Sequence, residues 1–160
     1  MIINRYAISE LRRMYPIQPI LFTSLPGDPL HEGHVSLLLA SKSIIKNYDI
    51  PILVVAVNDD QFLINKKGYV TLPAKTRISV IDAIRNVDYT FLWYDGTQTV
   101  AGAIELLRPN YFLKGGDRTP ENFDPTEKKI CDMIGCTIVY GVGGDKIQSS
   151  SKLCKKPIKK

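Results

Sequence analysis

Two histidines are the side chains of this 160-residue chain whose type and spacing best suit chemistry, and the sequence has no others. His31 and His34 are separated only by Glu32 and Gly33, where an apolar stretch gives way to a turn with Pro and Gly and then to a predicted helix. The start of a helix directs unpaired N–H groups and the positive end of its dipole toward one point, which favours a phosphate there. Two imidazoles at that point can donate hydrogen bonds as negative charge develops, so the pattern indicates chemistry at a phosphate.

Two plainer interpretations of these histidines stay open. A zinc site needs further ligands, but no third ligand is close in sequence, and Cys131, Cys136 and Cys154 are scattered singly. The pair could also be ordinary surface or core histidines, which is the default for a four-residue pattern. Gly33 has no side chain to block a ligand at the first helical turn, and both histidines fall where a strand is predicted to meet a helix. This context favours the functional interpretation.

Length and composition indicate an ordinary single-domain protein. Residues 1–160 are enough to bury roughly two thirds of the unfolded surface around one core. The apolar and charged fractions, 44% and 23%, are typical of soluble proteins, and no apolar run approaches the ~20 residues of a membrane span. Residues 1–11 lack the apolar core of a signal peptide, and the three unpatterned cysteines fit a reducing compartment. We therefore expect a cytoplasmic protein with no membrane partner.

The formal charge of +5 is concentrated at one end of the chain. Five lysines lie in the last nine residues, mostly in a basic tail at 155–160. The rest of the chain is near neutral, so a small ligand that carries phosphate explains the balance as well as a nucleic acid does. We expect no nucleic-acid partner.

Strands and helices are predicted to alternate along the chain. An amphipathic helix at 9–14 lies in a lead-in segment, residues 1–18. Strands are predicted at 20–24, 52–57, 89–93, 111–113 and 137–140, and helices at 33–47, from 74 to about 87, at 97–107 and 126–133, with a last helix start at 149–153. The unbroken apolar run at 52–57 is typical of a parallel strand covered on both faces. The order predicts an α/β fold, a Rossmann-like doubly wound parallel sheet of about five strands in a single domain.

One connection of this fold carries two lysines. Residues 65–73 show no periodicity, so we predict an exposed loop that is hinged at Gly68 and carries Lys66 and Lys67. Such a pair is most often a solvated patch; at the carboxyl edge of the sheet, the loop could also fold over a triphosphate.

The histidine pattern, together with Asp28, resembles the Asp-x-x-His-x-Gly-His signature of the nucleotidyltransferase superfamily. Further segments come in the order, and near the spacing, of its cytidylyltransferase-like branch. They are Val55-Ala56-Val57-Asn58-Asp59-Asp60, Lys67-Gly68, Arg77, Asn86-Val87-Asp88, Lys114-Gly115-Gly116-Asp117 and Ser149-Ser150-Ser151. Within that branch the chain looks most like the adenylyltransferase domain that makes ADP-heptose, by transfer to D-glycero-beta-D-manno-heptose 1-phosphate, for bacterial lipopolysaccharide.

The chain departs from the pattern of the branch at three places. Leu25-Pro26-Gly27-Asp28 stands where the family usually has Gly-x-Phe-Asp, and three serines at 149–151 replace Ser-Thr-Thr. The Arg-Thr-x-Gly block of the glycerol-3-phosphate cytidylyltransferases is missing, and residues 143–147 stand there instead.

The resemblance implies an enzyme that transfers a nucleotidyl group, adenylyl from ATP, to a sugar phosphate such as heptose 1-phosphate and releases pyrophosphate. On that pattern His31, His34 and Lys67 are the catalytic residues, and Mg²⁺ bridges phosphate oxygens with Asp28 as a protein ligand. A homodimer is implied. The implied nucleotide-binding residues are Ser24, Gly27, Asp28, Gly33, Lys66, Arg77, Lys114, Gly115, Asp117, Ser149, Ser150 and Ser151.

The residues leave other functions open. A relative in the same branch could transfer cytidylyl from CTP to glycerol 3-phosphate, or act on a flavin nucleotide. A chain that has kept the fold while its turn drifted could be a non-catalytic nucleotide sensor. We expect ATP, because Gly115 and Gly116 leave room for a purine beside the backbone, although the same two glycines could merely form a tight turn.

Overall fold

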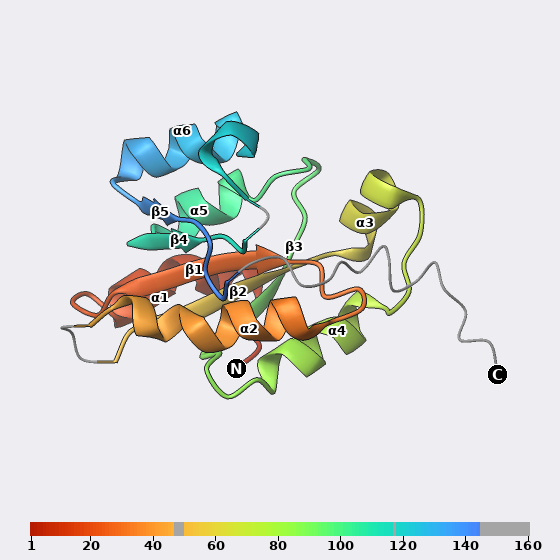
Figure 1. Ribbon diagram of the computed structural model, residues 1–160, viewed down its shortest axis with the longest axis horizontal. Coiled ribbons are helices and arrows are strands. Elements are labelled where there is room, and N and C mark those ends of the chain that lie inside the picture. The colour runs from red at the N-terminus through yellow and green to blue at the C-terminus, as the bar shows by residue number, and fades with distance from the viewer. Residues whose placement is uncertain (47–49, 117, 145–160) are drawn as a thin grey trace.

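The computed structural model describes residues 1–46, 50–116 and 118–144 (Figure 1). Five parallel strands form one sheet in the order β3-β2-β1-β4-β5. The strands are β1 (Ile20–Leu25), β2 (Ile52–Asn58), β3 (Tyr89–Trp93), β4 (Tyr111–Leu113) and β5 (Thr137–Val139). The predicted doubly wound, Rossmann-like sheet is thereby confirmed. The predicted helix start at 149–153 and the basic tail lie outside the described residues.

Helices cover both faces of the sheet (Figure 1). One face carries α1 (Ile8–Met14), α5 (Ala101–Leu107) and α6 (Pro125–Ile134), and the other carries α2 (Glu32–Ser41) and α4 (Ala74–Asp82). A further helix, α3 (Asp60–Lys67), lies at the carboxyl edge of the sheet, and short 3-10 turns occur at Arg5–Ala7, Lys42–Ile44 and Pro120–Asn122. None of the helices in these ranges is long and apolar enough to cross a membrane.

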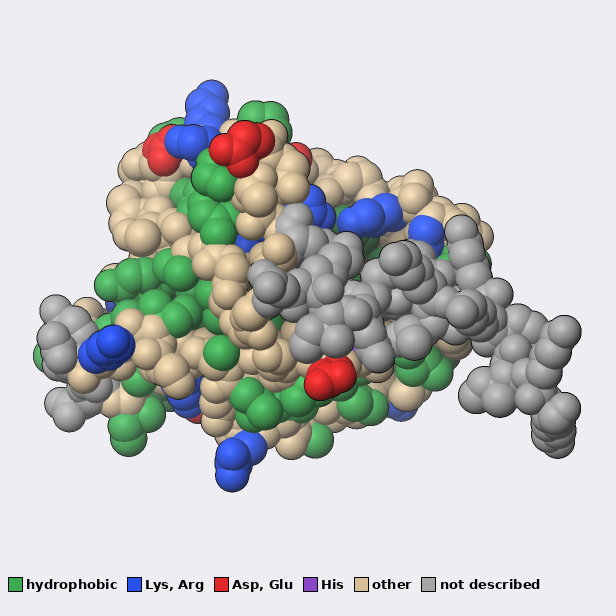
Figure 2. Space-filling view, in the orientation of Figure 1, with side chains coloured by type: hydrophobic (Ala, Val, Ile, Leu, Met, Phe, Trp, Pro, Cys, Tyr) green, Lys and Arg blue, Asp and Glu red, His purple; other side chains and the backbone are tan. Residues whose placement is uncertain are grey.

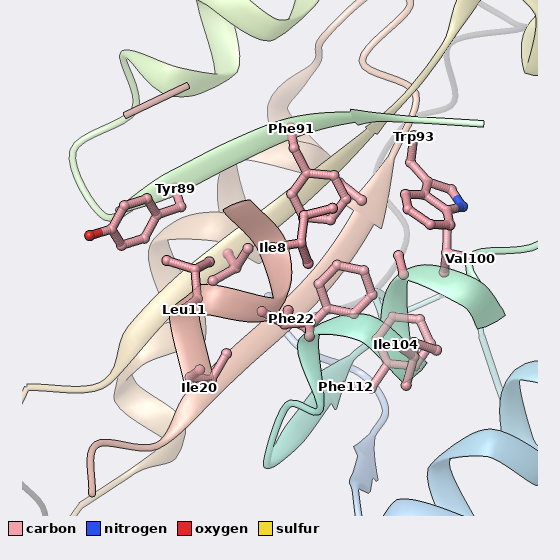
Figure 3. Close-up of a cluster of buried hydrophobic side chains, with 14 of the residues drawn as sticks. Ile8, Leu11, Ile20, Phe22, Tyr89, Phe91, Trp93, Val100, Ile104 and Phe112 are labelled. Carbon is pink, nitrogen blue, oxygen red and sulfur yellow. The ribbon is translucent and has the colours of Figure 1, made fainter. Parts of the chain in front are cut away.

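The central strands feed two separate cores because successive side chains point to opposite faces. All seven residues of β2 are buried; Val54 and Ala56 pack under α1 and α5, whereas Leu53 and Val55 pack over α2 and α4. In the first core, shown in Figure 3, the Phe22 ring lies between those of Phe91 and Phe112, with centroids 6.3 and 5.1 Å away. This burial fixes the position of the strand ends.

The strand order reverses between β1 and β4. From β1 it continues outward through β2 to β3, whereas β4 lies on the other side of β1 and continues to β5. In open sheets of this kind ligands bind where the strand order reverses, outside the carboxyl ends. The carboxyl ends of β1 and β4 form that point here.

The prediction of an exposed loop at 65–73 is wrong in its first part, because Lys66 and Lys67 form the last turn of α3. The Asp59 side chain caps the start of this helix by accepting from Gln61 N, and Gly68 ends it in the left-handed conformation, with φ 83°. Two cations at the end of a helix also suit its dipole. The lysines are therefore held by a capped helix.

Three other helices are shorter than predicted. The helix expected at 97–107 begins at Ala101, and the one expected from 74 to about 87 ends at Asp82. The helix expected at 33–47 ends at Ser41 and passes into a 3-10 turn. Leu37 and Leu38 are its buried leucines, while Leu39 is 41% exposed.

Candidate active site

A cavity of about 610 Å³ opens at the carboxyl ends of β1 and β4, which is a usual size for a small-molecule site. It lies between α2 on one face of the sheet and the starts of α5 and α6 on the other. On the visible surface Lys and Arg side chains lie in small separate groups among neutral and apolar ones (Figure 2). The lining residues are Thr23, Ser24, Leu25, Pro26, Asp28, His31, Gly33, His34, Leu37, Asn58, Phe62, Leu63, Lys66, Lys67, Gln98, Val100, Leu113, Lys114, Gly115, Gly116, Arg118, Phe123, Asp124, Glu127, Val142, Gly143 and Gly144.

The two histidines lie side by side at the start of α2 and both line the cavity. His31 is the N-cap residue, in an extended conformation, and its carbonyl oxygen accepts from His34 N at 2.9 Å. The two imidazoles stack with their centroids 3.8 Å apart. A Cβ on Gly33 would meet the His31 ring at 3.2 Å, so this glycine makes room for the imidazole.

Asp28 is completely buried and its carboxylate is saturated by hydrogen bonds. Oδ2 accepts from Lys67 Nζ at 2.7 Å and from Thr71 N at 2.9 Å, and Oδ1 accepts from Leu72 N at 2.7 Å. Burial alone would raise the pKa of this carboxyl, but the bonds from Lys67, Thr71 and Leu72 outweigh it and lower the pKa. The Asp28-Pro29 peptide is cis. Both oxygens of Asp28 thus bind protein donors, and its role as a metal ligand stays a prediction.

Lys67 and Lys66 reach the cavity from the last turn of α3. The Lys67 ammonium pairs with Asp28 and lies 4.4 Å from the centre of the Tyr69 ring, with the side chain 18% exposed. Lys66 is exposed. A phosphate in the cavity would meet the two lysines in different states, one held by a carboxylate and one in contact with solvent.

Arg77 and Gly27, both expected to bind nucleotide, are not among the residues that line the cavity. The buried Arg77 guanidinium donates to Pro26 O, Asn58 O and Leu72 O at 2.6 to 2.8 Å, and it pairs with Asp60. Gly27 has φ 59°, and a Cβ there would meet Ile81 at 2.9 Å. Both positions therefore shape the backbone behind the cavity.

On the opposite wall a second ion pair joins Lys114 to Glu127. Lys114 Nζ lies 3.1 Å from Glu127 Oε2, and Glu127 Oε1 accepts from Val100 N at 3.0 Å. Sequence reasoning missed Glu127. Its only signal was a helix start: Asp124, with Pro125 after it, caps α6 by accepting from Thr126 N and Glu127 N. That pattern predicts the helix but does not indicate that Glu127 pairs with Lys114, the residue after β4.

We call Asp28, His31, His34 and Lys67 the β1 side of the cavity, and Lys114, Phe123 and Glu127 the β4 side.

A glycine turn after β5 closes the cavity against α2. Ser36 Oγ donates to Gly143 O at 2.6 Å, and a Cβ on Gly143 would lie 2.6 Å from Leu37 N. This close approach requires glycine, which also has φ 85° here. Ser36 was also missed. Of the other expected residues, Ser24, Gly33 and Gly115 line the cavity, whereas Asp117, Ser149, Ser150 and Ser151 lie outside the described residues.

The carboxylates on the cavity wall do not fit the direct magnesium ligand that we expected. Asp28, Asp124 and Glu127 are the described acidic residues that line it, and each accepts hydrogen bonds from protein donors. Within residues 1–46, 50–116 and 118–144 no group of three His, Cys, Asp or Glu could hold a metal ion. Mg²⁺ would accordingly arrive with a triphosphate, held by phosphate oxygens and water.

Comparisons with known proteins find relatives of this chain. The sequence model of the cytidylyltransferase-like family matches residues 28–142. The chain is 29% identical over 140 residues to the bifunctional protein HldE of Desulfatibacillum aliphaticivorans, covering 86% of this chain and 25% of that protein. It is 35% identical over 127 residues to the HldE of Halorhodospira halophila, covering 78% and 23%. The chain thus spans about a quarter of the length of these curated relatives.

A solved structure shares the fold. It is the lipopolysaccharide core biosynthesis protein from Thermoplasma volcanium, with a TM-score of 0.60 and 24% identity; the match covers 77% of this chain and 93% of that one.

Proposed function

This chain belongs to the cytidylyltransferase-like family and is a nucleotidyltransferase, and on that premise we propose that it transfers a nucleotidyl group from a nucleoside triphosphate to a small phosphorylated acceptor. The observation that carries the proposal is the stacked pair His31 and His34 at the start of α2, open to a cavity of ligand size. Both imidazoles and the helix N–H groups suit an anion at this place.

The reaction needs no covalent intermediate. A phosphate oxygen of the acceptor attacks the α-phosphorus of the triphosphate; a new P–O bond forms, and the bond to the β-phosphate oxygen breaks with its electron pair leaving on pyrophosphate. Because the nucleophile is already an anion, positioning and charge stabilisation carry most of the catalysis. We assign His31 and His34 to donate to phosphate oxygens as charge develops, and Lys66 to attract the triphosphate. The triphosphate would enter as its Mg²⁺ complex, as a substrate.

The finer assignment is ATP as donor and a sugar phosphate, such as heptose 1-phosphate, as acceptor. It is supported by the motif resemblance to the ADP-heptose-forming adenylyltransferases, by the HldE relatives, and by the paired glycines Gly115 and Gly116 on the cavity wall. Lys67 is assigned to the phosphates with the histidines, although it must share its ammonium with Asp28. The implied homodimer stays a prediction that sedimentation would check.

The test is a screen of the four nucleoside triphosphates against phosphorylated acceptors, with pyrophosphate release as the readout. The panel includes heptose 1-phosphate, glycerol 3-phosphate and a flavin mononucleotide. We expect release that depends on both substrates and is fastest with ATP. Tighter binding of CTP than of ATP in titration calorimetry would defeat the adenylyl assignment. Triphosphate binding without release from any acceptor would defeat the transferase proposal in favour of a sensor.

A further inference from the structure

The β4 side of the cavity holds charges that the reaction above does not use. The Lys114 and Glu127 side chains are 12% and 9% exposed, and their charged atoms lie 3.1 Å apart. Val100 N, at the start of α5, donates to the other carboxylate oxygen, so the Glu127 side chain of α6 is held against α5. The Lys114 ammonium also lies 3.9 Å from the centre of the Phe112 ring. A pair held on so many sides has a defined position and orientation.

The ammonium has more donors than the described residues use. An ammonium carries three N–H donors, and Glu127 is the one hydrogen-bond acceptor that reaches it within the described part of the chain. Lys114 lines the cavity. A donor so deeply buried is costly to leave unmatched, so the arrangement indicates a ligand atom that accepts from the cavity.

The surroundings of Lys114 suit the nucleoside part of the substrate better than its phosphates. Because Glu127 neutralises the ammonium, the pair has little net attraction for an anion. Phe123, Val100 and Val142 give this side apolar surface against which a flat base can lie. Phosphates have a better place at the histidines on the β1 side.

We propose that Glu127 is a positioning residue that holds the Lys114 ammonium toward the cavity, where it donates to a ring nitrogen or carbonyl oxygen of the nucleotide base. This inference rests on the proposed function, since it takes the occupant of the cavity to be a nucleoside triphosphate.

The groups around Lys114 shift its pKa in opposite directions, so the pH dependence of binding can test the role of Glu127. Burial lowers the pKa of Lys114, Glu127 opposes this effect, Arg118 lowers the pKa further and Cys131 raises it. Removal of the Glu127 charge leaves burial largely unopposed. Lys114 then loses its proton at a lower pH, and binding that depends on its donor is lost there.

Titration calorimetry with ATP and with inorganic tripolyphosphate separates a base contact from a phosphate contact. Lys114→Met should weaken ATP binding about 10-fold or more and change tripolyphosphate binding less than about 2-fold. Equal weakening with both probes would assign Lys114 to the phosphates and overturn the proposal, as would no weakening with either.

The role of Glu127 is tested by the pH dependence of ATP binding. Glu127→Gln keeps an acceptor for Val100 N but removes the charge, so the alkaline loss of affinity should move down by about one pH unit or more. Should that variant fail to fold, Glu127→Asp keeps the charge with a shorter reach and should move the loss by a smaller amount. Asp132→Asn, an exposed change on the same helix, is the control and should move nothing. An alkaline loss at the wild-type pH in the Glu127 variants would overturn the positioning role.

Pyrophosphate release, measured in parallel, keeps the two proposals apart. Wild-type protein that binds ATP but releases no pyrophosphate would end the transferase proposal, while the titrations would still decide on Lys114. Wild-type protein that binds neither ATP nor CTP would overturn both.

Discussion

The two buried ion pairs that border the cavity differ in how far the protein satisfies the hydrogen-bonding capacity of their charged groups. On the β1 side, the Asp28 carboxylate accepts from Lys67 and from two backbone N–H groups, Thr71 N and Leu72 N. On the β4 side, the Lys114 ammonium has one acceptor among the described residues. The first pair is saturated by the protein and holds backbone in place. The second keeps donors for a ligand. Changes to the Asp28 pair should therefore mainly affect the free energy of unfolding, and changes to the Lys114 pair should mainly affect ligand binding.

The largest effect is expected from Asp28→Ala, which leaves Lys67 and two backbone donors without their acceptor. The free energy of unfolding should fall by about 3 kcal/mol or more, measured by urea denaturation. Asp132→Ala, which removes an exposed carboxylate paired with Lys128, is the control. A similar small loss in both variants would contradict the difference between a saturated pair and a surface pair.

The same carboxyl predicts an acid limit to stability. Its pKa is lower in the folded protein than in the unfolded chain. Its stabilisation is therefore complete above about pH 4 and is lost as pH falls below that value through the folded-state pKa. Asp28→Asn should flatten this part of the curve of stability against pH. A dependence of turnover on Mg²⁺ that shifted strongly in Asp28→Asn would instead restore the metal-ligand interpretation.

A rate effect is expected next, from His34 on the β1 side. If the imidazole acts mainly on the transition state, His34→Ala should lower kcat by ~10² or more while triphosphate binding falls much less. Steady-state kinetics and calorimetry on the same preparation measure the two. Equal losses would make the β1 side a binding surface like the β4 side.

The glycine turn that closes the cavity should show a smaller loss of stability. Gly143→Ala puts a Cβ 2.6 Å from Leu37 N and should cost about 2 kcal/mol. Gly141→Ala is the matched control, because Gly141 also has a positive φ but has nothing within 4 Å of the added Cβ. Denaturation of both variants isolates the close approach from the backbone strain. Identical losses would mean that packing on α2 contributes nothing.

The smallest effect is expected for Lys66, an exposed cation at the rim of the β1 side. Lys66→Met should weaken triphosphate binding only about 2- to 5-fold, and the difference should vanish at high salt because exposed charges are screened. Lys128→Met, outside the cavity lining, is the control. A salt-independent loss of 10-fold or more would place Lys66 in direct contact with phosphate.

The sheet could be predicted because buried strands leave a pattern within their own sequence. The apolar run that forms β2 is buried along its whole length, and the resemblance to the cytidylyltransferase-like branch is confirmed by the family match. Helix α3 was missed although both of its end signals, Asp59 and Gly68, are present. Its eight residues bury only Phe62 and Leu63, which is too few to show a period.

The site could be predicted only as far as its signals are local. The two histidines come together because four residues and a helix start suffice to place them. Arg77 and Asp28 were assigned to the ligand from the resemblance. Their observed partners are mostly backbone groups from distant segments, which no side-chain pattern reveals. Glu127 pairs with Lys114, the residue that follows β4, and nothing near Glu127 in sequence indicates the pair.

The hydrogen bonds of Asp28 also bear on which wall of the cavity can move. Thr71 and Leu72 belong to a stretch with no helix or strand, yet their N–H groups donate to a fully buried carboxylate, and Leu72 O accepts from the buried Arg77. Such amides exchange with solvent deuterium only when the surrounding structure opens, so their exchange should be as slow as that of the central strands. We therefore expect the irregular connection between α3 and α4 to stay attached to the edge of the sheet when the cavity opens.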